Sequence, residues 1–156
     1  MAVRRPSLAI TLVLAAALPL AAAHAELAKW DQAKVSALSK QLVETTKALQ
    51  DTFATRPPPT LGSNDSRDYY RLKQVVRRIR QEAGSLDSDL RAGGGMEATQ
   101  NSYESLMTNV RDAREIAGRI FATQDIKDRA TAVRTVLNQI APYYDPDAVP
   151  LEPSMR

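Results

Sequence analysis

Residues 69–90 read YYRLKQVVRRIRQEAGSLDSDL, and the spacing of their apolar side chains indicates the fold class. Apolar residues recur at alternating steps of three and four along this segment, and such a stripe occupies one face of an α-helix. The stripe consists of Tyr69, Leu72, Val76, Ile79, Ala83, Leu86 and Leu90. A helix with one narrow apolar stripe must bury it against neighbours, so the segment predicts a helical bundle.

Three further segments carry the same spacing, and none of the four alternates with the period of two that a strand requires. Their stripes are Val35, Leu38, Leu42, Thr45 and Leu49; Tyr103, Leu106, Val110, Ala113, Ala117 and Ile120; and Ile126, Ala130, Val133, Leu137 and Ile140. The sequence therefore predicts an all-α fold over residues 26–144. Because short connections make neighbouring helices antiparallel, we expect an up-down-up-down four-helix bundle.

The breaks between the segments differ in strength. Residues 57–59 are three prolines, which cannot continue a helix, and Asp65 or Ser66 can cap the second helix. Residues 93–95 are three glycines, which suit a helix C-terminus. The third break rests on phase alone, since Ile126 is rotated by about 80° from Ile116 on a continuous helix. We expect a turn or kink at residues 123–125, giving two helices or one kinked helix.

The two ends of the chain are predicted to lie outside the bundle. Residues 8–22 form an apolar run of about fifteen residues after Arg4 and Arg5, and Ala23-His24-Ala25 has the small-x-small pattern of a cleavage site. The run is shorter than the roughly 20 residues of a membrane-spanning helix, so we expect a Sec-type signal peptide over residues 1–25, cleaved after Ala25, and no transmembrane helix in the mature protein. Residues 145–156 contain three prolines and predict an extended, poorly ordered tail that can be removed at almost no cost.

Removal of the signal peptide changes the charge balance. The chain has 21 Lys and Arg, of which Arg4 and Arg5 leave, so that 19 basic residues face 18 acidic ones. The basic character of the whole chain therefore does not indicate nucleic-acid binding. The chain has no cysteine, and its single histidine is His24, within the signal peptide.

This composition excludes the common cofactor and catalytic sites of helical bundles. Covalent haem needs a Cys-x-x-Cys-His motif, a b-type haem needs an axial histidine, and a ferritin-like di-iron site needs Glu-x-x-His pairs. Nucleophile–base pairs built from cysteine or histidine are also excluded. We therefore expect no cofactor and no enzymatic activity; a minimal enzyme that uses paired carboxylates is the weakest alternative. The acidic residues, Asp87 with Arg91 among them, are expected in solvated i,i+4 pairs.

Two groups of residues are candidate binding sites. Six basic residues and a tyrosine gather within residues 67–80, namely Arg67, Tyr70, Arg71, Lys73, Arg77, Arg78 and Arg80. They are either a solvated face whose arginine stems cover the core edge, or an interface for an anionic envelope surface or another envelope protein. The second group is an aromatic end formed by Trp30, Tyr103 and Tyr144, which either seals the bundle or holds a small apolar ligand.

The aromatic residues at the opposite end, Phe53, Tyr69 and Phe121, are expected to seal the bundle there together with Ile126. The sequence as a whole predicts a periplasmic or secreted protein that acts by binding, most readily through its basic segment. A carrier or sensor of a small apolar ligand is the alternative, and homo-oligomerisation stays open.

Overall fold

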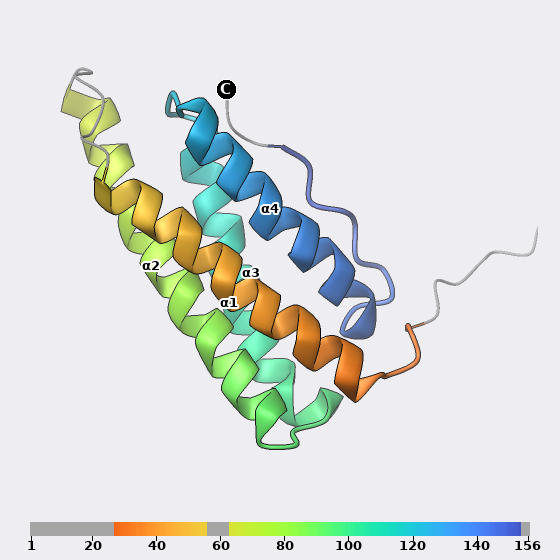
Figure 1. The fold of residues 1–156 in the computed structure, drawn as a ribbon. Coiled ribbons are helices and arrows are strands. Elements are labelled where there is room, and N and C mark those ends of the chain that lie inside the picture. Colours follow the sequence, from red (N-terminus) through yellow and green to blue (C-terminus); the bar gives the residue numbers. More distant parts are fainter. Residues whose placement is uncertain (1–26, 56–62, 154–156) are drawn as a thin grey trace, which may run out of the picture.

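The computed structural model describes residues 27–55 and 63–153, and this part of the chain contains four α-helices, one short 3-10 helix and no strand (Figure 1). The helices are α1 (Gln32–Thr55), α2 (Ser63–Arg91), α3 (Met96–Ala117), α4 (Gln124–Ile140) and the 3-10 helix η1 (Ala141–Tyr143). The all-α fold class predicted from the sequence is confirmed. The predicted signal peptide lies outside the described residues.

The helix boundaries correct two predictions. α2 begins at Ser63, slightly before the predicted caps at Asp65 or Ser66. α3 and α4 are separate helices, but residues 118–123 connect them, so the break comes earlier than the predicted residues 123–125. Gly118 takes the C-cap position of α3, and its amide N–H donates to the carbonyl of Arg114 at 3.1 Å. Gly118 keeps a right-handed conformation, with φ −64° and ψ −15°, so the end of α3 does not depend on a left-handed glycine.

The predicted apolar stripes form the core. Its largest fully buried side chains come from all four α-helices and include Phe53, Leu42, Leu72, Leu106 and Leu137. One position in α1 differs, because Thr46 is buried whereas Thr45 is only partly buried. The hydroxyl of Thr46 donates to the carbonyl of Leu42 at 2.7 Å, which satisfies its polar atom inside the core.

Polar contacts join the helices in a regular order. Along α1, Ser39 and Gln50 contact Asp87 and Arg80 of α2 at 2.9 Å and 3.2 Å. Residue numbers therefore rise along α1 as they fall along α2. The pair α2 and α3 shows the same reversal, since Asp89 accepts from Ser102 and Arg78 donates to Asn109.

The turn after α2 explains the three glycines. Gly93 has φ +88°, a left-handed conformation that favours glycine, and the amide N–H of Gly94 donates to the carbonyl of Asp89 at 2.9 Å. The side-chain amide of Gln32 donates to the carbonyls of Leu90 and Gly94 at 3.1 and 3.2 Å. The start of α1 therefore caps the end of α2.

The four α-helices are not packed equally closely. α2 packs extensively against α1 and α3, and α1 also packs against α4, whereas α3 and α4 make few close backbone approaches to each other. After η1 the chain turns back and runs beside α4 toward the end where α3 connects to α4 (Figure 1). The space between α3 and α4 is therefore bordered by this C-terminal segment.

Candidate binding surfaces

The basic residues of α2 share its solvent-exposed side. Leu72, Val75, Val76 and Ile79 are buried and fix the rotation of the helix. We call the basic residues opposite them the basic face, defined as Arg67, Arg71, Lys73, Arg77, Arg78 and Arg80. All six are exposed except Lys73, which is partly buried. Their spacing puts Lys73, Arg77 and Arg80 along one flank of the buried stripe and Arg71 and Arg78 along the other.

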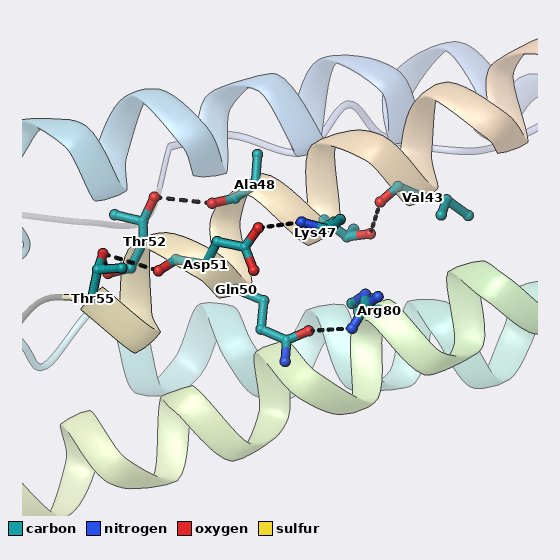
Figure 2. Close-up of polar contacts among 9 residues, drawn as sticks. Val43, Lys47, Ala48, Gln50, Asp51, Thr52, Thr55 and Arg80 are labelled. Atoms are coloured by element: carbon teal, nitrogen blue, oxygen red, sulfur yellow. Dashed lines mark hydrogen bonds and ion pairs between the residues drawn. The ribbon is translucent and has the colours of Figure 1, made fainter.

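Two members of the basic face are tied to neighbouring helices. The guanidinium of Arg80 donates to the side-chain oxygen of Gln50 on α1 at 3.2 Å (Figure 2), and that of Arg78 donates to Asn109 on α3 at 3.1 Å. Arg71 and Arg77 have no hydrogen bond or ion pair with any residue that the structure describes. Their charges are therefore free to meet an external partner.

The acidic residues do not neutralise this surface. Within residues 67–82 the acidic residues are Glu82 and Asp68, and the carboxylate of Asp68 lies 3.7 Å from the guanidinium Nε of Arg119 in the connection between α3 and α4. On α1 the exposed side chains of Lys47 and Asp51 form an ion pair at 2.5 Å, so Asp51 neutralises Lys47 rather than an arginine of the basic face (Figure 2). Tyr70 extends the basic face, since its side chain is 55% exposed and its ring meets that of Tyr69 edge-on. The result is a positively charged, tyrosine-flanked surface.

The aromatic end is assembled as predicted. The rings of Tyr103 and Tyr144 stack with centroids 4.3 Å apart, and Trp30 meets Tyr144 edge-on at 5.6 Å. The indole N–H of Trp30 donates to the side chain of Gln32 at 2.9 Å, and the hydroxyls of Tyr144 and Thr99 lie 2.8 Å apart. The close contact of these rings with one another fits the interpretation that they seal the bundle. Trp30 lines neither of the two cavities described below, so the structure adds no support for a ligand at that side chain.

Burial changes the acidity of the stacked tyrosines. It raises the pKa of Tyr103 to about 12, with the neighbouring Asp145 carboxylate adding to the effect. Burial also raises the pKa of Tyr144, and its hydrogen bond with Thr99 opposes that change. Both phenols are therefore neutral at physiological pH.

The opposite end differs from expectation at Phe121. The rings of Phe53 and Tyr69 do meet there, with centroids 5.4 Å apart. Phe121 is 70% exposed, however, because α3 has already ended at Ala117 and the residue lies in the connection to α4. Ile120 in that connection and Ile126 in the first turn of α4 are buried instead. The prediction that Phe121 seals the bundle is wrong.

A groove that the sequence did not predict lies between α3 and α4. One part of it is a cavity of about 160 Å³ whose apolar lining includes Leu49, Leu72, Val76, Ile79, Val110 and Val133. A second, more polar cavity of about 670 Å³ continues it toward Tyr103 and Tyr144. Arg114, Leu137 and Leu151 line both cavities, and we call the combined feature the α3–α4 groove.

The C-terminal segment occupies the mouth of this groove. The amide N–H of Leu151 donates to the side-chain oxygen of Asn138 on α4 at 2.9 Å, and the guanidinium of Arg114 on α3 donates to the carbonyl of Glu152 at 3.4 Å. The side chain of Leu151 packs against the core. The segment is extended, as predicted, but over its described residues it is docked rather than poorly ordered. Sequence reasoning missed Arg114, Asn138 and Leu151; the one signal was an apolar residue placed between Pro150 and Pro153.

Comparisons of the chain with protein-family models, curated proteins and solved structures find no match. Within residues 27–55 and 63–153, no helix combines the length and apolar character needed to cross a bilayer. The described part of the chain also holds no cluster of three or more acidic residues with metal-binding geometry.

Proposed function

We propose that this chain is a non-enzymatic binding protein of the cell envelope, which engages an anionic partner through the basic face of α2. The partner is either an acidic surface of another envelope protein or the phosphate-bearing headgroups of the membrane. The observation that carries the proposal is the pair Arg71 and Arg77, which are exposed and have no acidic partner among the described residues.

The charge arrangement supports an anionic partner over a purely solvated face. Arginine forms bidentate hydrogen bonds with carboxylates and phosphates, and tyrosine and arginine are enriched at the energetic centres of interfaces. The basic face places these residue types beside one another on a rigid helix whose opposite side is buried. A solvated face that only covers the core edge would be expected to alternate its charge signs, as the Lys47–Asp51 pair does.

The test is charge reversal of the two unpaired arginines. We expect the variant Arg71→Glu/Arg77→Glu to fold normally, because neither side chain has a polar contact to lose among residues 27–55 and 63–153. Its binding to vesicles of anionic phospholipid should fall at least about 30-fold, since each basic residue near such a surface contributes about 1 kcal/mol. Vesicle co-sedimentation, together with cross-linking in the intact envelope, separates a lipid from a protein partner.

The matched control is Lys29→Glu/Lys40→Glu, which changes the net charge equally at two exposed residues away from the basic face. We expect this control to retain wild-type binding. Equal loss in both variants would show a non-specific charge effect, and equal retention of all partners would overturn the proposal. Raising the ionic strength from about 0.05 M to about 0.5 M should weaken binding by the wild-type protein.

The proposal includes the compartment and the topology. Export by a signal peptide over residues 1–25, cleaved after Ala25, predicts that the mature chain starts at Glu26, which mass spectrometry of the exported protein checks. The opposite residue order along α1 and α2, and along α2 and α3, supports an antiparallel up-down-up-down bundle. A carrier role for Trp30, Tyr103 and Tyr144 is the second candidate: Tyr103 and Tyr144 line the cavity of about 670 Å³, but the three rings also contact one another, as a seal would.

A further inference from the structure

The α3–α4 groove contains an occupant that belongs to the chain itself. The extended segment 149–153 lies across the groove without forming a helix or a strand. Its backbone is held at two points, by Asn138 on one wall and by Arg114 on the other. Between these points Leu151 lines both cavities. The contacts are those that a groove makes with an extended peptide: backbone hydrogen bonds on either side of an apolar anchor.

The groove is only partly filled by this occupant. A cavity of about 160 Å³ with a largely apolar lining remains beside the segment, and this is similar to a cavity of about 150 Å³ that can hold a benzene-sized group. The docking is also shallow, since Val149 is 83% exposed beside the partly buried Leu151. A segment with a better-fitting apolar side chain could therefore bury more surface in the same place.

The guanidinium of Arg114, on the α3 wall of the groove, is not fully hydrogen-bonded either. The guanidinium of Arg114 reaches the Glu152 carbonyl at a long 3.4 Å, and its Nε atom is buried without a hydrogen-bond partner in the described part of the chain. A buried N–H without an acceptor costs free energy. Lys127 and Arg134 also line the cavity of about 160 Å³. An acceptor with negative charge, next to the apolar anchor, would satisfy this wall better than a backbone carbonyl does.

We propose that the α3–α4 groove is a binding site for an extended peptide with an apolar residue followed by an acidic one, and that segment 149–153 is an intramolecular occupant that such a peptide displaces. The site is separate from the basic face of α2 and does not depend on the function proposed for it. The tethered segment competes at an effective concentration of order 1 mM, so it acts as a regulatory strap over the groove.

The test adds the strap as a separate peptide. The probe is a fluorescently labelled peptide with the sequence of residues 145–153, DPDAVPLEP. The receptor is the full chain with Leu151→Asp, which removes the apolar anchor and frees the groove. We expect this variant to bind the peptide at least about tenfold more tightly than the wild-type chain, in which the tethered strap competes. A peptide whose own leucine is replaced by aspartate should not bind.

The matched control is Val149→Asp, which places the same charge at an exposed residue of the segment and should bind the peptide no better than wild type. In the Leu151→Asp background, Asn138→Ala should weaken peptide binding, because it removes the acceptor for the backbone N–H. Equal affinity in the wild-type, Leu151→Asp and Val149→Asp proteins would overturn the proposal and leave the segment as a fixed part of the fold.

A second measurement covers the case in which Leu151→Asp does not fold. The chain has no cysteine, so Val149→Cys can be labelled selectively with an environment-sensitive fluorophore. Excess unlabelled peptide should shift the emission as the strap leaves the groove, and the leucine-to-aspartate peptide should not. Absence of a shift at millimolar peptide would contradict the proposal. A shift with dodecanoate but not with peptide would contradict it too, because the groove would then be a lipid site.

Discussion

The turn between α2 and α3 leaves no room for a side chain at Gly94. A Cβ atom on Gly94 would lie 2.8 Å from the carbonyl oxygen of Asp89 and 3.2 Å from Cγ2 of Thr99, and the first of these is backbone that cannot move aside. We expect Gly94→Ala to lower the free energy of unfolding by about 1–3 kcal/mol. Gly95 has open space at the same position, so Gly95→Ala should cost almost nothing. Urea denaturation of the two variants checks the difference, and equal stabilities would contradict the described turn.

The Tyr103 phenol links stability to alkaline pH. Its pKa is raised to about 12 in the folded chain, whereas the unfolded phenol ionises near 10. Its contribution to stability is therefore fully present below about pH 10 and is lost as the pH rises toward 12. We expect the urea midpoint to fall over this interval, and to fall less in Tyr103→Phe, which keeps the stack on Tyr144. Tyr70→Phe, at an exposed position, is the control and should follow the wild-type curve.

Asp87 shows how one buried acid depends on its partner. Its side chain is 2% exposed and accepts a hydrogen bond from Ser39 at 2.9 Å while also pairing with Arg91. The sequence placed Asp87 and Arg91 in a solvated pair, and the burial of the carboxylate corrects that interpretation. We expect Ser39→Ala to cost about 1–3 kcal/mol, since it leaves one carboxylate oxygen without its donor. Urea denaturation measures this loss, and Ser85→Ala, at an exposed position of α2, should leave the free energy of unfolding unchanged in the same experiment.

At the scale of the elements, each apolar stripe predicts where the replacement of a side chain by alanine lowers stability. Leu42 is fully buried in α1 and Ile79 is 4% exposed in α2. We expect Leu42→Ala or Ile79→Ala to lower the free energy of unfolding by roughly 2–5 kcal/mol, against a total of about 5–15 kcal/mol. Thr45→Ala should have little effect, because Thr46 rather than Thr45 holds the buried position. A large loss for Thr45→Ala would contradict this rotation of α1, since it would place Thr45 in the core.

The elements themselves were largely predictable, because a stripe with steps of three and four can belong only to a helix. The contacts of Tyr144 with Trp30 and Tyr103 were predictable as well, since the expected up-down-up-down order of the segments puts these residues at one end. The exact ends of the helices were not, and Gly118 and Ser63 mark the differences. The last residue of a helix depends on which partners its few terminal N–H and C=O groups bond, and a single residue can change these partners.

At the scale of the whole molecule, the docked C-terminal segment replaces the expectation of a free tail. The partly buried Leu151 and its hydrogen bond to Asn138 should contribute about 1 kcal/mol, so Leu151→Ala should lower the melting temperature by several degrees. Hydrogen exchange gives a direct measurement: the Leu151 amide should be protected and the Val149 amide should not. Equal exchange at the two amides would show that the segment is free.

The sequence alone determined the helical class, the four segments, the basic residues grouped on α2 and the lack of any thiol or imidazole beyond residue 25. These properties are local, since they follow from the order of side chains along one helix or from composition. Only the tertiary structure decided that α3 and α4 stand apart, that Asp87 is buried and that Leu151 returns to the gap between them. Periodicity tells which face of a helix is apolar; it does not tell how close the facing helix lies, because that distance depends on the packing of all four helices at once.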